Sequence, residues 1–268
     1  MSQFTRPLRS AQRGVTLVEL MVGLTLSLLV ILAVASLVLM QKRSYSTQDD
    51  SARMQENART LSSRLSRELR LAGYRDIQSG VSFAAPTITG VNAVAGSPNA
   101  SDSFQILYYG ASSPAGVGDA SIVNCFGETV AATTLQRTTY FIANDAASGE
   151  PSLFCGDGAR TRALVPGVES MQILIGEDTG GTGGVGRYTP FGAGAPVDPR
   201  SILIAVLMRS PSTGHPAPTS ATFNLFGEAY APAGAAPAGD EGAVFVAPAD
   251  GRIRKVVLLN IGLRNFLD

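Results

Sequence analysis

Two stretches of the chain contain residue types that could support catalysis, and neither has the surroundings that catalysis needs. Gly181 to Gly186 fits the G-x-G-x-x-G spacing of a dinucleotide-binding turn, but Arg187 to Pro190 follow it, so no helix can hold a pyrophosphate there. His215 is the only histidine, and no G-x-S-x-G motif or convincing serine or cysteine partner accompanies it. We interpret both stretches as loops and expect neither an enzyme nor a cofactor.

Glu19 is a carboxylate at the start of a long apolar segment. From Leu20 to Met40 there is no charged residue and no proline, and Val15 to Val18 extend the apolar run to about 26 residues. As a helix this run is roughly 39 Å long, more than the roughly 30 Å of a hydrocarbon core. An acid at membrane depth costs about 2.5–3.5 kcal/mol or more, so we expect Glu19 to have a function.

The residues before this segment predict its orientation. Met1 to Gly14 include Arg6, Arg9 and Arg13 and no acid, which gives the leader a charge of +3. Basic segments stay on the cytoplasmic side of a membrane. We therefore expect the chain after Met40 to lie on the opposite side, in the periplasm.

A short basic leader that ends in Gly14, followed by Thr16-Leu17-Val18-Glu19 and an apolar helix, resembles the class III signal of type IV pilins and type II secretion pseudopilins. The resemblance implies that a membrane peptidase cuts between Gly14 and Val15 and methylates the new amino terminus at Val15. It also implies that Glu19 neutralises the amino terminus of a neighbouring subunit during assembly. The chain departs from the family pattern at Val15, where Phe or Met is usual.

Three other interpretations of the segment remain open. An ordinary membrane anchor has the right length but explains neither Glu19 nor Gly14. A secretory signal is compatible with Ala33-Val34-Ala35 before Ser36, although its apolar region would be unusually long and would contain an acid. A buried core helix fits least well, because the run has so few polar breaks.

Composition limits the class of the remaining chain. The 21 basic and 21 acidic residues balance, so there is no electrostatic signature of nucleic-acid binding, and the 29 glycines and 15 prolines predict a loop-rich domain. Cys125 and Cys155 are the only cysteines. In an exported chain we expect them to form a disulfide, which stabilises by roughly 3–4 kcal/mol for a loop of about 30 residues. Two buried free thiols are the alternative, and no metal site is expected.

The helix is predicted to continue beyond the membrane, as one element from about Thr16 to Ala72. Apolar residues recur at steps of three and four, and Gly73 is a typical stop. These apolar residues are Met54, Ala58, Leu61, Leu65, Leu69 and Ala72. The charged residues between them, which include Arg53, Glu56, Arg59, Arg64, Arg67, Glu68 and Arg70, are interpreted as a solvated outer face.

After Gly73 the pattern changes to short strands separated by turn clusters. Strands are predicted over 104–109, 138–142, 171–175, 202–208 and 253–263, and loops over 110–119, 176–199, 210–220 and 231–242. The fold class is therefore α+β, a long amino-terminal helix packed on an antiparallel β-sheet, as in pilins.

Three segments of this half are similar to PilW-type minor pilins: 168–178, 201–210 and 250–265. Many major pilins have a cysteine near the carboxyl terminus, and none follows Cys155 here, which favours a minor subunit. In relatives the 176–199 loop can carry several acids suited to Ca²⁺. Here only Glu177 and Asp178 precede a glycine run, too few ligands for a secure site.

The resemblance implies a minor pilin that helps to start or cap a type IV pilus. We expect a leader (1–14), a transmembrane and assembly helix (15–40), its amphipathic continuation (41–73) and a periplasmic β-rich domain (74–268). The implied partners are the prepilin peptidase, other minor pilins, the major pilin, a tip adhesin and the inner-membrane assembly platform. A minor pseudopilin of type II secretion, or a membrane-tethered binding or adhesive module that never polymerises, are the alternatives.

Overall fold

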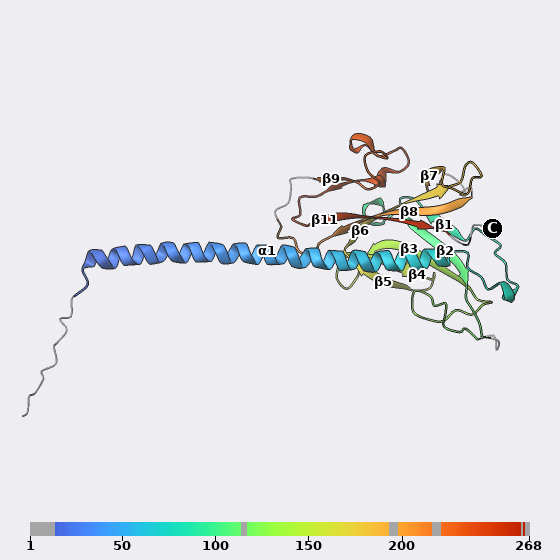
Figure 1. Ribbon diagram of the computed structural model, residues 1–268, viewed down its shortest axis with the longest axis horizontal. Coiled ribbons are helices and arrows are strands. Elements are labelled where there is room, and N and C mark those ends of the chain that lie inside the picture. Colours follow the sequence, from blue (N-terminus) through green and yellow to red (C-terminus); the bar gives the residue numbers. More distant parts are fainter. Residues whose placement is uncertain (1–13, 114–116, 193–197, 216–220, 264, 266–268) are drawn as a thin grey trace, which may run out of the picture. The chain divides into compact units, whose positions relative to one another are not determined.

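The computed structural model describes residues 14–113, 117–192, 198–215, 221–263 and 265. The leader residues 1–13, with their three arginines, lie outside the described residues. The chain forms two compact units, Met1–Thr47 and Gln48–Asp268. One helix, α1 (Leu17–Leu71), belongs to both units, and its bounds differ by one residue at each end from the predicted helix (Figure 1).

In the first unit α1 presents its apolar side chains outward. Every Val, Leu, Ile and Met from Val15 to Met40 is at least 51% exposed, which excludes a core helix for this segment. The hydroxyl groups of Thr25, Ser27 and Ser36 each donate a hydrogen bond to a backbone carbonyl three residues earlier, at 2.8–2.9 Å. Because these polar groups are satisfied within the helix, they do not oppose burial in lipid.

In the second unit α1 buries one face. Met54, Leu61, Leu65 and Leu69 are almost fully buried, at the spacing expected for an amphipathic helix. Glu68, which the sequence placed on the solvated face, is also buried, at 2% exposure. That expectation was wrong because Glu68 lies beside Leu69 and is paired with Arg67 at 2.7 Å, which offsets the burial of its charge.

The carboxyl end of α1 is closed by residues from distant parts of the sequence. Gly73 has a φ of +74°, the left-handed conformation that ends helices, and its N–H donates to the carbonyl of Leu107 at 2.9 Å. The side-chain amide of Asn265 donates to the carbonyl oxygens of Ala72 and Arg70, at 2.8 and 3.1 Å. Carbonyl groups that a helix end leaves unpaired are thereby satisfied.

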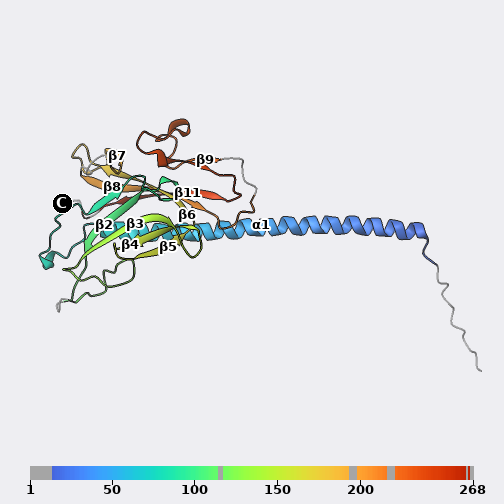
Figure 2. The same ribbon diagram turned by 180° about the vertical axis from the view of Figure 1, so that it is seen from behind.

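The strands form two main antiparallel sheets and a separate ribbon, instead of the single sheet that was expected (Figures 1 and 2). The five-stranded sheet has the order β1-β2-β3-β4-β5: Ile88–Val91, Ser103–Tyr109, Leu135–Asn144, Pro151–Gly156 and Thr161–Pro166. The four-stranded sheet has the order β11-β8-β6-β7: Arg254–Gly262, Pro199–Arg209, Val168–Glu177 and Arg187–Pro190. The ribbon pairs β9 (Ala221–Asn224) with β10 (Val244–Ala247).

All five predicted strands correspond to observed ones: β2, β3, β6, β8 and β11. The sequence missed β1, β4, β5, β7, β9 and β10, and β7 lies inside the predicted 176–199 loop. Four of the missed strands have only four residues, too few for an alternating pattern to be recognised. All ten residues of β6 are buried, because both faces of this strand are covered.

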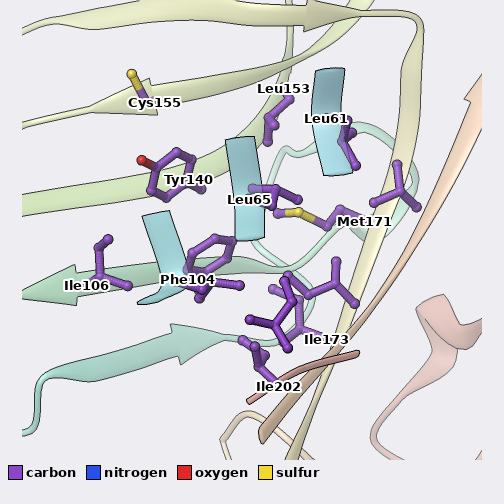
Figure 3. Close-up of a cluster of buried hydrophobic side chains, with 14 of the residues drawn as sticks. Leu61, Leu65, Phe104, Ile106, Tyr140, Leu153, Cys155, Met171, Ile173 and Ile202 are labelled. Atoms are coloured by element: carbon purple, nitrogen blue, oxygen red, sulfur yellow. The ribbon is translucent and has the colours of Figure 1, made fainter. Parts of the chain in front are cut away.

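The main core lies between the buried face of α1 and both main sheets (Figure 3). Leu61 and Leu65 of α1 enter it from the helix, and Phe104 of β2 stacks on Tyr140 of β3 with ring centroids 4.9 Å apart. A second, smaller core lies between β8 and the ribbon; it contains Ala205, Leu207, Leu225, Phe245 and Ala247. β8 is therefore packed on both faces.

Candidate functional site

The first candidate site is the start of α1. Gly14 and Val15 precede the helix and are exposed, and Thr16 caps it. The Thr16 hydroxyl oxygen accepts a hydrogen bond from the backbone N–H of Glu19 at 3.2 Å, and the Thr16 carbonyl accepts one from Leu20 at 3.1 Å. Thr16 and Glu19 thus occupy the N-cap and N3 positions of a capping-box sequence, which the sequence interpretation missed.

The Glu19 carboxylate is available for a partner. Within the described residues it forms no hydrogen bond or ion pair through its side chain; only its backbone N–H takes part in the cap. A negative charge in the first helical turn is favoured by the helix dipole, by typically 0.3–1 kcal/mol. That is less than the about 2.5–3.5 kcal/mol that an acid costs at membrane depth, so capping alone does not explain Glu19.

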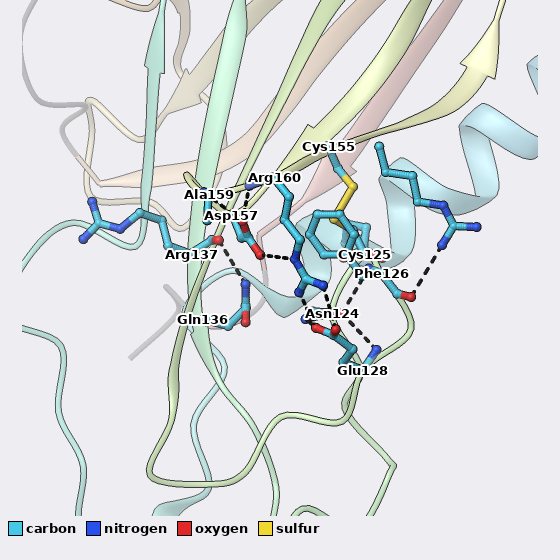
Figure 4. The surroundings of a disulfide bond; sticks show 12 residues. Asn124, Cys125, Phe126, Glu128, Gln136, Arg137, Cys155, Asp157, Ala159 and Arg160 are labelled. Carbon is cyan, nitrogen blue, oxygen red and sulfur yellow. Dashed lines mark hydrogen bonds and ion pairs between the residues drawn. A yellow bond between two sulfur atoms is a disulfide. The ribbon is translucent and has the colours of Figure 1, made fainter. Parts of the chain in front are cut away.

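The disulfide between Cys125 and Cys155 is present, with Cα atoms 6.5 Å apart (Figure 4). Cys155 is on β4, the strand next to the edge strand β5 of the five-stranded sheet, and Cys125 is on the long segment between β2 and β3. Both are almost fully buried. The bond therefore fixes an irregular segment to the sheet.

A second set of contacts, close to the disulfide, also holds the segment between β2 and β3 in place (Figure 4). Arg160 forms a bidentate pair with Glu128, at 2.8 and 2.5 Å, and lies over the Phe126 ring at 4.1 Å from its centroid. The hydrogen bonds from Arg160 and Asn124 lower the pKa of Glu128 to about 2. Paired with a cation and accepting a further hydrogen bond, Glu128 is a structural carboxylate.

His215 is bound to an acid but does not form a catalytic triad. Its Nε2 is 2.6 Å from the Asp50 carboxylate, and both side chains are buried. The Ser212 hydroxyl donates to the other oxygen of Asp50 at 3.1 Å, so it is directed at the acid and not at the imidazole. In a hydrolytic triad the serine must contact the histidine. The arrangement instead ties the 210–215 segment to α1.

The acids of the predicted 176–199 loop are used to hold its backbone. Glu177 pairs with Arg187 at 2.8 Å. Asp178 accepts hydrogen bonds from the N–H groups of Gly180, Thr182 and Gly183, at 2.6–3.2 Å. Among the described residues no group of three or more His, Cys, Asp or Glu side chains is placed to hold a metal.

The three segments that resemble PilW-type pilins come together in the structure. They form the adjacent strands β6, β8 and β11 of the four-stranded sheet, and their ionisable side chains meet at one end of it. Residue 264, within the third segment, lies outside the described residues. Three arginines and three acids alternate in a closed ring of ion pairs 2.6–4.0 Å long, in the order Glu150, Arg209, Glu169, Arg254, Asp250, Arg252.

The ring, which we call the ionic ring, is partly buried. The side chains of Arg254 and Glu169 are 3% and 6% exposed. The hydrogen bonds from Arg254 lower the pKa of Asp250 to about 2. No spacing in the sequence predicts the ring, because its members come from four segments that only the sheet topology brings together.

Two regions of the chain, one that contains the start of α1 and one that contains the four-stranded sheet, match known families. Residues 9–35 match the prokaryotic N-terminal methylation motif, and residues 139–265 match the type IV pilus-assembly protein W. A type IV-like pilin from Thermus thermophilus is similar in structure, with a TM-score of 0.43, 18% identity, and coverage of 79% of this chain and 97% of that one. No curated protein matches the chain.

The methylation motif at the head of a long apolar helix, followed by an antiparallel β-rich unit, defines a type IV pilin-like protein. Proteins of this class are structural subunits. The match over residues 139–265 is narrower: this part of the chain is similar to the type IV pilus-assembly protein W.

Proposed function

We propose that the chain is a minor pilin that takes part in initiation of a type IV pilus and in its tip complex. The observation that carries the proposal is the Glu19 carboxylate: it has no partner within the described chain, and it stands at the head of an exposed apolar helix that matches the methylation motif. A charge in this position needs a cationic partner from another molecule.

The amino terminus of an adjacent subunit is the partner that fits. The prepilin peptidase would cut between Gly14 and Val15, where the chain is exposed and precedes the helix, and would methylate Val15. The resulting ammonium group and Glu19 of a neighbour form an ion pair in the apolar bundle of helices. Val15 to Met40 serve first as the membrane anchor and then as the helical core of the filament.

The proposed topology follows from the charges. Residues 1–14 are cytoplasmic, 15–40 span the inner membrane, 41–73 continue the helix and 74–268 form the periplasmic domain. Its partners are the prepilin peptidase, other minor pilins, the major pilin, a tip adhesin and the assembly platform in the inner membrane. The role is structural, and neither catalysis nor nucleic-acid binding is part of it.

The test is Glu19→Ala, with Ser27→Ala as the matched control. Ser27 lies in the same apolar segment, but its hydroxyl is satisfied within the helix at 2.9 Å. Removing one side of a buried ion pair costs about 3–5 kcal/mol, so Glu19→Ala should leave membrane insertion intact and reduce recovery of the subunit in sheared pili. Ser27→Ala should be recovered like the wild type. Wild-type recovery of Glu19→Ala would favour a simple membrane tether.

Sequencing the mature amino terminus tests the processing step separately. We expect a methylated Val15, and a bulky residue in place of Gly14 should leave full-length precursor in the inner membrane. A mature terminus at Ser36 would identify a secretory signal instead. The neighbouring genes would separate a pilus subunit from a pseudopilin of type II secretion.

A further inference from the structure

Two aspartates are buried close together in the β-rich unit without a cation. Asp102, before β2, is 0% exposed, and Asp240, before the short turn Glu241–Ala243, is 1% exposed. In the described part of the chain no Arg, Lys or His forms an ion pair with either carboxylate. Two buried carboxylates near one another are stabilised by a compensating positive charge.

Three oxygen atoms in this region are buried and have no hydrogen-bond partner among the described residues: Asp240 Oδ1, Gln172 Oε1 and Asn92 Oδ1. The orientation of both amides is fixed, because Gln172 Nε2 donates to the Ala100 carbonyl at 2.9 Å and Asn92 Nδ2 donates to the Gly239 carbonyl at 2.7 Å. Since the amide nitrogens are the partnered atoms, the unpartnered atoms of Gln172 and Asn92 are their oxygens, which can only accept. The unpartnered atoms are therefore three acceptors.

Contacts between the segments bring these oxygens to one place. Asn92 contacts Gly239, the residue before Asp240, while the next residue, Ala93, donates its N–H to Asp102 at 2.9 Å. On the other side, the Ile173 N–H donates to Asp102 at 2.8 Å, so Gln172 is adjacent.

The Gln172 amide also packs so tightly on Gly242 that a Cβ there would overlap it. Gly242 is only two residues from Asp240. The Tyr230 hydroxyl closes the cluster by donating to Asp240 Oδ2 at 2.7 Å.

We propose that Asp102 and Asp240, with the amide oxygens of Gln172 and Asn92, form a binding site for Ca²⁺. Calcium takes six to eight oxygen ligands, from carboxylates, amide carbonyls and water, whereas Mg²⁺ keeps several waters and seldom has an all-protein cage. The ion neutralises both buried charges and satisfies all three oxygens. One proposed ligand, Asn92, also lines a cavity of about 400 Å³, together with Ala93, Ala238 and Gly239.

The site joins segments that are far apart in the sequence: the ends of the β1–β2 connection, strand β6, and the turn before β10. It is separate from the 176–199 loop, whose acids Glu177 and Asp178 hold the loop's own backbone. The sequence predicted no metal site. The four proposed ligands are separated by 10, 70 and 68 residues, a spacing that follows no motif.

Terbium luminescence tests the proposal on the full chain in detergent micelles. Tb³⁺ replaces Ca²⁺ at oxygen sites, and Tyr230 is placed to sensitise its emission; the chain has no tryptophan. We expect saturable emission that added CaCl₂ displaces, a loss of that emission in Asp240→Asn, and its retention in the matched control Glu241→Gln. Tyr230→Phe should lose most of the emission while still binding calcium by calorimetry.

Thermal unfolding provides a second readout. At a hundredfold excess of CaCl₂ over its Kd, the Tm of the wild type should rise by about 5–10 °C, and that of Asp240→Asn should not rise. Asn92→Ala, at a half-buried position, should bind calcium several-fold more weakly. The proposal is overturned if the wild type shows neither effect, if Asp240→Asn and Asn92→Ala both bind normally, or if Asp178→Asn abolishes the emission.

Discussion

The side chain of Asn265 caps the end of α1 across 193 residues of sequence, by donating to the Ala72 carbonyl at 2.8 Å. The segment that follows β11 is thus joined directly to the end of α1. Asn265→Ala should lower the free energy of unfolding of this unit by about 1 kcal/mol, because the Ala72 carbonyl loses its donor.

Denaturant unfolding of the full chain in detergent, followed by near-ultraviolet circular dichroism, measures this change. Asn144→Ala is the control, since Asn144 is exposed at the end of β3. Equal effects of the two substitutions would show that the cap does not contribute.

Loss of the disulfide should destabilise the β-rich unit. In the double variant Cys125→Ser, Cys155→Ser we expect a loss of roughly 3–4 kcal/mol, because an unfolded chain without the 30-residue loop has more conformational freedom. Chemical denaturation with and without dithiothreitol measures it. The reductant should affect the wild type and leave the double variant unchanged; linked peptides in non-reducing mass mapping would confirm the pairing in cells.

The ionic ring should make the stability of the unit fall in acid. The pKa of Asp250 is lowered from 3.8 to about 2, chiefly by the hydrogen bonds from Arg254, so its stabilising effect is complete above about pH 4 and is lost as the pH falls through 2. Asp250→Asn should remove about 2 kcal/mol at pH 7 and flatten the pH dependence in this window. Unfolding curves at pH 2 to 7 test this, and an unchanged slope between pH 4 and 2 would contradict it.

Gly90 on β1 packs closely against Phe191, the residue that follows β7. A Cβ at Gly90 would overlap the ring of Phe191, which is 6% exposed and has little room to move. Gly90→Ala should therefore destabilise the unit by about 1–3 kcal/mol. Gly262→Ala is the control, because nothing lies within 4 Å of the corresponding position there. Thermal unfolding of both variants, with a lower Tm only for Gly90→Ala, would confirm the contact.

The helix and the processing signal could be predicted from the sequence because their determinants are local. The uncharged run from Leu20 to Met40 and the spacing of Leu61, Leu65 and Leu69 each lie within a few turns of one helix. The long strands β2, β3, β6, β8 and β11 were predicted for the same reason, since seven or more residues are enough to show an apolar pattern.

Features that depend on topology could not be predicted. The burial of Glu68 depends on which residues of β2 and β3 lie opposite the helix, and the pair of Asp50 and His215 spans 165 residues. The buried acids Asp102 and Asp240 each stand next to turn residues, which in a sequence are typical of exposed loops. Thr16 is the exception, because its spacing to Glu19 is a local capping signal that the sequence does contain.

The closed alternation of charges in the ionic ring also constrains how the sequence can change. Each of its six members contacts two of opposite sign, so a single loss of charge leaves two neighbours partly unpaired in a region of low exposure. A lysine for an arginine preserves the alternation, whereas an exchange of sign requires compensation at both neighbours. Among relatives, we therefore expect these six positions, which lie on four separate segments, to vary together.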